Sequence, residues 1–167
     1  MEFREGELVF EFPEDWTVER LDMQGRPMPE GMQFVDCIAE NQDRLIFIEV
    51  KDPSAASVPE RGKNAARREL ESGALINDRL VPKGRDSYTY VHLMERDSKP
   101  ISYLVVLGLE DVPIDNALLL TLNDRLRRRL DQEAHEPWKR QYVAACAVMR
   151  TTDVARFNPP FQLRRAH

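Results

Sequence analysis

Short apolar runs separated by turn-forming residues predict the strands of this chain. Residues 7–12 alternate, with Leu8, Phe10 and Phe12 on one side, as expected of a strand that buries one face. In the segment 44–51, residues 45–48 place apolar side chains on both faces, which is typical of a central strand. The pattern as a whole predicts strands over residues 7–12, 32–39, 44–51, 101–109 and 142–149.

Apolar residues recur at helical spacing in the segments between these strands. Residues 114–130 carry a leucine stripe on one face, and residues 59–72 form a second helix that Gly73 ends as a left-handed C-cap. Residues 74–81 look helical, and Pro82 is expected to close them. The stripe consists of Leu118, Leu119, Leu122, Leu126 and Leu130.

The remaining segments are less regular. In residues 86–96 the spacing of Val91 and Met94 favours a helix, capped by Asp86 or Ser87, over a strand. The other segments are predicted as a short helix or turn at 13–22, a loop at 25–31, and turns at 41–43 and 83–86. The turn at 41–43 joins its two flanking strands as a hairpin.

The order of these elements predicts one α/β domain over residues 1–167, built as a mixed β-sheet flanked by helices. No stretch reaches the roughly 18 apolar residues of a membrane span. Residues 1–20 lack the basic start and apolar centre of a signal peptide. Cys37 and Cys146 lie in apolar runs and indicate buried free thiols. The protein is therefore expected to be cytoplasmic, with no membrane partner.

Charge is unevenly distributed along the chain. The formal net charge of −5 argues mildly against a protein that coats nucleic acid. However, residues 121–167 contain ten Arg and Lys against five Asp and Glu, and arginines outnumber lysines nineteen to five over the whole chain. Because guanidinium groups bind phosphate as bidentate forks, the composition permits a local phosphate-binding surface.

A group of charged residues lies at the end of the predicted hairpin. Glu49 and Lys51 share one face of their strand, and Asp36 in the partner strand can face them. The carboxylates of Asp36 and Glu49, with the carbonyl of Val50, suit Mg²⁺ or Mn²⁺, which prefer oxygen ligands. Lys51 can orient an attacking water or stabilise a pentacovalent phosphorus. A cross-strand salt bridge at the sheet end explains the same residues without a metal.

An acid-x-lysine triplet alone is a weak signal, because about one is expected by chance at this composition. The chain contains two, Glu49-Val50-Lys51 and Asp97-Ser98-Lys99. The second lies in a polar loop beside Pro100 and serves as an internal reference for chance occurrence. Only the first ends an apolar strand and has an upstream acid at hairpin distance, so its context carries the weight.

With Asp36 after Val35, the triplet from Glu49, a helix from residue 59 and a strand from residue 101, the chain resembles the PD-(D/E)xK nuclease superfamily. The resemblance implies a restriction-endonuclease-like core over about residues 5–110 and a C-terminal helix–strand extension over about residues 111–167. Val35 stands where many members have proline. An acid from the first helix often joins the site in this superfamily, and the candidates here are Glu11, Glu14 and Glu19.

The resemblance implies a magnesium-dependent nuclease that hydrolyses nucleic-acid phosphodiester bonds, with DNA as the leading substrate. The resemblance implies that Asp36, Glu49 and Lys51 are the catalytic residues. A homodimer would suit double-strand cleavage. Because the superfamily includes inactive members, the alternative is a non-catalytic subunit that binds a partner protein or nucleic acid. An unrelated α/β protein with an accidental triplet is a third interpretation.

Basic residues on two predicted helices are candidates for nucleic-acid contact. The interleaved Glu60, Glu69 and Glu71 favour a solvated face with ion pairs instead, and cations also suit the last turns of a helix. The candidates are Arg61, Lys63, Arg67, Arg68, Arg127 and Arg128.

Two aromatic features have both a structural and a functional interpretation. Trp16 and Trp138 are predicted to pack on the core rather than to stack on bases. The tail sequence Phe-Asn-Pro-Pro-Phe at residues 157–161 suits either a docking arm for a second copy or a tail packed on its own domain.

Overall fold

A five-stranded mixed sheet forms the centre of the molecule. The computed structural model describes residues 1–23, 29–133 and 136–166. The strands of the central sheet lie in the order β3 (Thr17–Arg20), β4 (Cys37–Glu40), β5 (Leu45–Lys51), β6 (Ile101–Leu107) and β9 (Ala145–Arg150). β4 is antiparallel to both of its neighbours, β3 and β5, whereas β5, β6 and β9 are parallel. The predicted α/β architecture with a mixed sheet is therefore confirmed.

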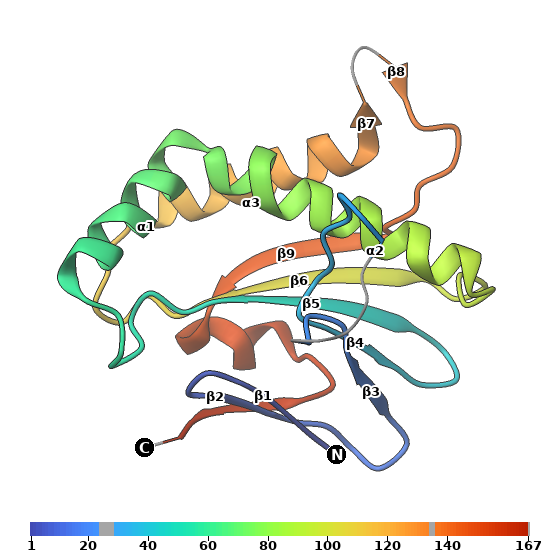
Figure 1. Ribbon diagram of the computed structural model, residues 1–167, viewed down its shortest axis with the longest axis horizontal. Coiled ribbons are helices and arrows are strands. Elements are labelled where there is room, and N and C mark those ends of the chain that lie inside the picture. Colours follow the sequence, from blue (N-terminus) through green and yellow to red (C-terminus); the bar gives the residue numbers. More distant parts are fainter. Residues whose placement is uncertain (24–28, 134–135, 167) are drawn as a thin grey trace.

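The two faces of this sheet have different covers (Figure 1). Helices cover one face: α1 (Glu60–Ser72), the π-helical η1 (Leu75–Leu80), α2 (Val81–Leu93) and α3 (Asn116–Asp131). The opposite face carries a small sheet in the order β1 (Glu2–Glu5), β2 (Leu8–Glu11) and β10 (Gln162–Arg165), together with the 3₁₀ helix η2 (Thr151–Phe157). A separate two-stranded pair consists of β7 (Gln132–Glu133) and β8 (Glu136–Pro137).

The alternating side chains of β5 separate two apolar cores. Leu45 and Phe47 belong to the core under the helices, whereas Ile46, Ile48 and Val50 belong to the core against the small sheet. This is the assignment of faces expected from strand periodicity, and it turns the odd-numbered side chains of β5 toward the helical layer. Glu49 and Lys51 therefore lie on the helix-covered face.

The predicted hairpin between β4 and β5 is present. The side-chain oxygen of Asn41 accepts the backbone N–H groups of Asp43 and Arg44 at 3.0 and 3.1 Å, which closes the turn. In the resulting register Cys37 lies opposite Ile48. The strand β4 is shorter than the predicted 32–39, and it begins directly after Asp36.

The prediction of a short helix or turn over residues 13–22 is wrong in its second half. Thr17–Arg20 form the edge strand β3, which pairs with β4 through Thr17–Glu40 and Arg20–Cys37. Four residues with only one β-branched pair give little local signal, so pairing with a neighbouring strand decides the conformation. The predicted loop 25–31 falls partly on residues 24–28, outside the described residues.

Pro82 does not close the preceding helical segment. It occupies the first turn of α2, where a proline needs no partner for its missing N–H, and α2 therefore begins at Val81 rather than at Asp86 or Ser87. The prediction of a helix over 86–96 is confirmed in type. The predicted turn over 83–86 is wrong, because these residues are helical.

The remaining helices and the tail follow the predictions more closely. Gly73 ends α1 with φ of 78°, as predicted for a left-handed C-cap, and Leu122, Leu126 and Leu130 of α3 are buried. The tail packs on its own domain: Phe161 is buried, with its ring centroid 5.2 Å from those of both Phe10 and Phe12.

Three smaller predictions have mixed outcomes. Trp16 is buried as predicted, whereas Trp138 is 42% exposed, so its predicted packing on the core is wrong. Cys37 is buried and Cys146 half-buried, and both are free thiols. Among the described residues, no helix is both long and apolar enough to cross a membrane.

Candidate active site

The structure brings Asp36 and Glu49 together beneath the helices. Since Cys37 pairs with Ile48, the antiparallel register carries on to place Asp36 opposite Glu49 at the end of the β4–β5 pair. Both side chains are almost inaccessible, with 6% of Asp36 and 0% of Glu49 exposed. Two carboxylates in such a place are costly unless cations or donors surround them.

Backbone hydrogen bonds fix the position of Asp36. Its Oδ2 accepts the N–H of Val50 at 2.6 Å, and its own carbonyl accepts the N–H of Leu21 at 3.0 Å. The N–H and C=O of one strand residue point to the same side of the strand, so the Val50 carbonyl also faces the β4 side of β5. Asp36, Glu49 and Val50 are thus neighbours at this end of the β4–β5 pair.

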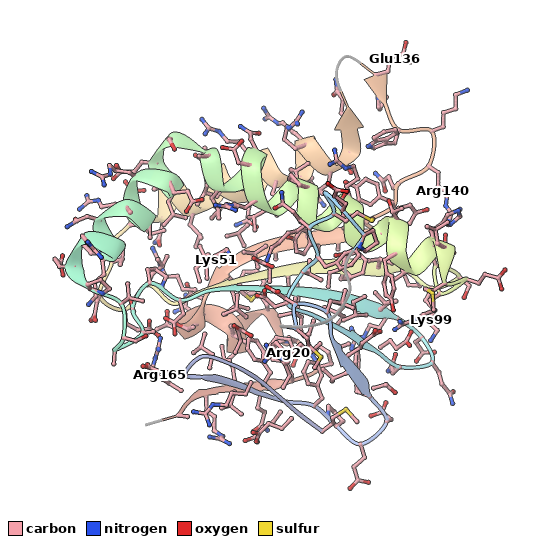
Figure 2. All side chains as sticks on the ribbon, viewed as in Figure 1. Arg20, Lys51, Lys99, Glu136, Arg140 and Arg165 are labelled. Atoms are coloured by element: carbon pink, nitrogen blue, oxygen red, sulfur yellow. The ribbon has the colours of Figure 1, made fainter. Side chains whose placement is uncertain are left out.

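Lys51 completes the part of the site that the sequence predicted. Its Nζ lies 2.8 Å from Oε1 of Glu49, as expected for side chains two positions apart on one strand face. The Lys51 side chain is 37% exposed and lines a cavity of about 270 Å³ beside α1. In Figure 2 it lies between the sheet and the helical layer. Lys51 therefore connects the buried carboxylates to solvent.

A second lysine, Lys83, enters the cluster from α2, and the sequence analysis missed it. Its Nζ donates to both oxygens of Glu49 at 2.7 Å each and lies 3.4 Å from Oδ1 of Asp36. Only 12% of its side chain is exposed. Asp36, Glu49, Lys51 and Lys83 are called the acid–lysine cluster below.

The start of α2 places Lys83 above the sheet. Gly84 packs so closely that a Cβ there would lie 3.0 Å from the ring of Tyr103 on β6. The Tyr103 hydroxyl donates to the carbonyl of Leu80 at 3.1 Å, which ties the same end of the helix to the sheet. Pro82 was the sequence signal that could have placed Lys83 on a helix, because proline favours the first helical turn.

Burial and the neighbouring lysines act in opposite directions on the pKa of Glu49. Burial and the neighbouring Asp36 raise the pKa of Glu49, and they outweigh the two lysines. Burial alone would lower the pKa of Lys83, but Glu49 and Asp36 raise it above the ordinary lysine value. Burial also raises the pKa of the Tyr103 hydroxyl, so this group stays protonated. Lys83 is accordingly a charged ammonium throughout the neutral range.

The chemistry of the cluster fits a magnesium or manganese ion only in part. Two carboxylates and a carbonyl are a usual protein share for Mg²⁺, with waters or phosphate oxygens completing its shell. Over the described ranges 1–23, 29–133 and 136–166, no group of three or more His, Cys, Asp or Glu side chains is arranged to hold a metal. Lys83 bonds three of the four carboxylate oxygens that such an ion would use.

The three candidate acids for a further ligand have other positions. Glu11 lies in β2 and accepts from Arg164 at 2.6 Å, and Glu19 lies in β3 and accepts from Arg96 at 2.7 Å. Glu14 is in the exposed turn before β3. The described part of the chain begins with strands rather than a helix, and none of these three acids lies on a helix.

The basic residues predicted to contact nucleic acid lie on α1 and α3. On α1, Lys63 pairs with Asp111 at 2.9 Å and Arg67 with Glu71 at 2.9 Å, in agreement with the interpretation as a solvated face with ion pairs. The others are exposed: Arg61, Arg68, Arg127 and Arg128. The second triplet, Asp97-Ser98-Lys99, has different partners from the first. Asp97 binds His92 and Arg140, and Lys99 binds Asn41 and Glu40.

No family model, no curated protein and no solved structure matches this chain. The resemblance to the PD-(D/E)xK superfamily therefore rests on the residues and element order of this chain.

Proposed function

We propose that this protein is a nuclease that uses Mg²⁺ or Mn²⁺ to hydrolyse phosphodiester bonds of nucleic acid, with DNA as the leading substrate. The observation that carries the proposal is the burial of Asp36 and Glu49 side by side, with Lys51 bonded to Glu49 at 2.8 Å. A fold keeps two carboxylates in such a place at a cost in stability, and catalytic sites are where such costs are usually found.

Each residue has a role that its position supports. Asp36 and Glu49, with the Val50 carbonyl, would hold the ion, which when bound would lower the pKa of a water and offset phosphate charge. Lys51 reaches from the carboxylates toward the cavity beside α1, where it orients the water and stabilises the charged phosphorane. The Val50 N–H holds Asp36 in place for this work.

The arrangement of strands supports a restriction-endonuclease-like core. An antiparallel β3–β4–β5 meander is followed by a helical crossover to the parallel strand β6. The acid before β4 and the Glu-x-Lys at the end of β5 follow the same order as the superfamily's motif, which supports the proposal. The C-terminal α3, β9 and β10 then form the extension.

A non-catalytic role is the second candidate, and the position of Lys83 favours it. All four carboxylate oxygens of Asp36 and Glu49 already have a protein donor. Two carboxylates and two ammonium groups also cancel in formal charge. A cluster of this kind can serve as a structural ion network in a subunit that binds nucleic acid, a partner protein or a second copy of itself.

Cleavage of labelled DNA in Mg²⁺, Mn²⁺ and EDTA separates the two candidates. We expect metal-dependent cleavage by the native protein and at least about a hundredfold loss in Glu49→Gln and Lys51→Ala. Lys99→Ala, from the reference triplet, is the matched control and should cleave normally. Native protein that cleaves neither single-stranded nor double-stranded DNA or RNA would support the non-catalytic role.

A further inference from the structure

The ammonium of Lys83 lies where a metal ion shared by Asp36 and Glu49 would lie. It is 2.7 Å from each oxygen of Glu49 and 3.4 Å from Oδ1 of Asp36, and its side chain is 12% exposed. By contrast, Lys51 contacts Glu49 alone among the two acids and is 37% exposed. The two lysines therefore have different relations to the carboxylates, because only Lys83 bridges them.

A bridging ammonium and a divalent ion need the same oxygens. Mg²⁺ lies about 2.0–2.1 Å from its oxygen ligands. An ammonium group bonded to the same oxygens would be in contact with the ion, so the two cations cannot occupy the site together. The two cations would also repel each other strongly in a poorly hydrated site. Metal binding to the acid–lysine cluster thus requires that the Lys83 ammonium leave.

We propose that Lys83 is the resident cation of this site, which bridges Asp36 and Glu49 when no metal is bound and is displaced when a divalent ion enters. The proposal rests on the metal site of the proposed function and assigns its regulation to one residue of α2. It also explains how Asp36 and Glu49 can be metal ligands although all of their carboxylate oxygens have protein donors when no metal is bound.

Displacement of the side chain is the available route. Lysine has a flexible four-carbon stem, and rotation about it moves the ammonium without moving α2, which Gly84 and Tyr103 fix against β6. The cost of this movement lowers the metal affinity of the free protein.

The decisive measurement is Mn²⁺ affinity in native protein, Lys83→Met and Lys83→Arg. Methionine keeps an unbranched side chain that is one atom shorter and removes the charge, so we expect Lys83→Met to bind Mn²⁺ at least about tenfold more tightly. Lys83→Arg keeps a cation and should not gain affinity, and Lys99→Met is the control at an unrelated lysine. If Lys83 only held the site together, Lys83→Met would bind Mn²⁺ more weakly than native protein, because the two carboxylates would be less well fixed.

Thermal unfolding in EDTA gives a second result for the same variants. Lys83→Met should melt at a lower temperature than native protein without metal, and added Mn²⁺ should raise its melting temperature by more than it raises that of native protein. Equal or weaker Mn²⁺ binding by Lys83→Met would overturn the proposal. Tight binding without cleavage by either protein would uphold Lys83 as the resident cation while rejecting the nuclease.

Displacement of the Lys83 ammonium can also be tested in native protein, so the result does not depend on whether a variant folds. In protein with ¹⁵N-labelled lysine, the Lys83 ammonium should give an NMR signal of its own in EDTA, because it is bonded and shielded from solvent. Saturating Mg²⁺ should shift or remove this signal while leaving that of Lys99 unchanged. A Lys83 signal that stays in place when the metal binds would contradict displacement.

Discussion

Glu49 is the residue on which the stability of the cluster depends most directly. It is wholly buried, and it receives Lys51 on one oxygen and Lys83 on both. Burial and Asp36 nevertheless raise its pKa above the ordinary glutamate value of 4.5. A carboxylate with a raised pKa in the folded state binds a proton more readily there than in the unfolded chain, so folding is favoured by protonation.

This shift predicts a pH dependence that Glu49→Gln removes. Between pH 4.5 and the raised pKa, the folded state holds more protons at Glu49 than the unfolded state, so ionisation withdraws stability as pH rises. We expect the free energy of unfolding of metal-free Glu49→Gln, relative to native protein, to increase with pH across this window. Urea unfolding from pH 4 to 8 measures the difference, and a constant or falling difference would show that Glu49 is not held in this way.

Asp36 has a structural bond that asparagine can preserve. Its Oδ2 accepts the buried N–H of Val50 at 2.6 Å, and an amide oxygen can accept the same bond. We expect Asp36→Ala to be less stable than Asp36→Asn by about 1–3 kcal/mol, because alanine leaves the N–H without a partner. Chemical denaturation of the two variants gives this difference directly. Equal stabilities would mean that water or another group replaces the bond.

At the scale of elements, the first turn of α2 decides where Lys83 lies. Gly84 has no side chain at the point of closest approach, and Tyr103 beneath it is fully buried and bonded to Leu80. Glycine ordinarily weakens a helix by up to about 1 kcal/mol relative to alanine. Its presence here is explained by the close contact between α2 and β6.

Gly84→Ala is therefore expected to destabilise the protein despite alanine's higher helix propensity. The added Cβ would meet the Tyr103 ring at 3.0 Å, and the anchored ring has little room to move. We predict a net loss of about 1 kcal/mol, since overpacking outweighs the gain in propensity. Thermal and urea unfolding measure it. A more stable variant would show that α2 can move away from β6 at low cost.

At the scale of the whole molecule, the C-terminal strand is tied to the end of β5. Arg165 of β10 donates to both oxygens of Asp52, at 2.8 and 3.1 Å, and also binds Glu7 and Glu110. Asp52 directly follows Lys51 in the chain. Arg165 thus connects the small sheet to the end of β5 in the central sheet, and in Figure 2 it lies below Lys51.

Substitution of two adjacent arginines tests the importance of this connection. Arg165→Met removes a partly buried cation shared by three carboxylates, and we expect a loss of about 1–3 kcal/mol in the free energy of unfolding. Arg164→Met is the matched control, because Arg164 forms only exposed pairs with Glu2 and Glu11 and should change little. Equal effects in the two variants would argue against a specific role for the Arg165 cluster.

Periodicity predicted most of the central sheet, but it missed the edge strand β3 of that sheet and the edge strand β1 of the small sheet. The strands at Leu45–Lys51 and Ile101–Leu107 are long and apolar, so their own sequences identify them. The edge strands Glu2–Glu5 and Thr17–Arg20 contain four residues each, and their pairing with distant segments determines them. The register of β4 against β5 then brought Asp36 and Glu49 together, as strand alternation predicts.

Lys83 could not be predicted from the same reasoning. It lies 34 residues from Glu49 on another element, and its position depends on how α2 packs on β6. Strand alternation links residues within a hairpin, whereas helix-to-sheet packing links residues that share no periodic relation. The interpretation of Pro82 as a helix end moved the predicted start of α2 past Lys83, which concealed its position.

The central claim is that Asp36 and Glu49 form a divalent-metal site, and anomalous diffraction from crystals grown with Mn²⁺ tests it most directly. We predict one strong anomalous peak within bonding distance of both carboxylates and the Val50 carbonyl, with the Lys83 side chain turned away from Glu49. The peak should be absent in Asp36→Asn crystals treated identically. An undisturbed Lys83–Glu49 contact at saturating Mn²⁺, with no peak at the carboxylates, would contradict the metal site.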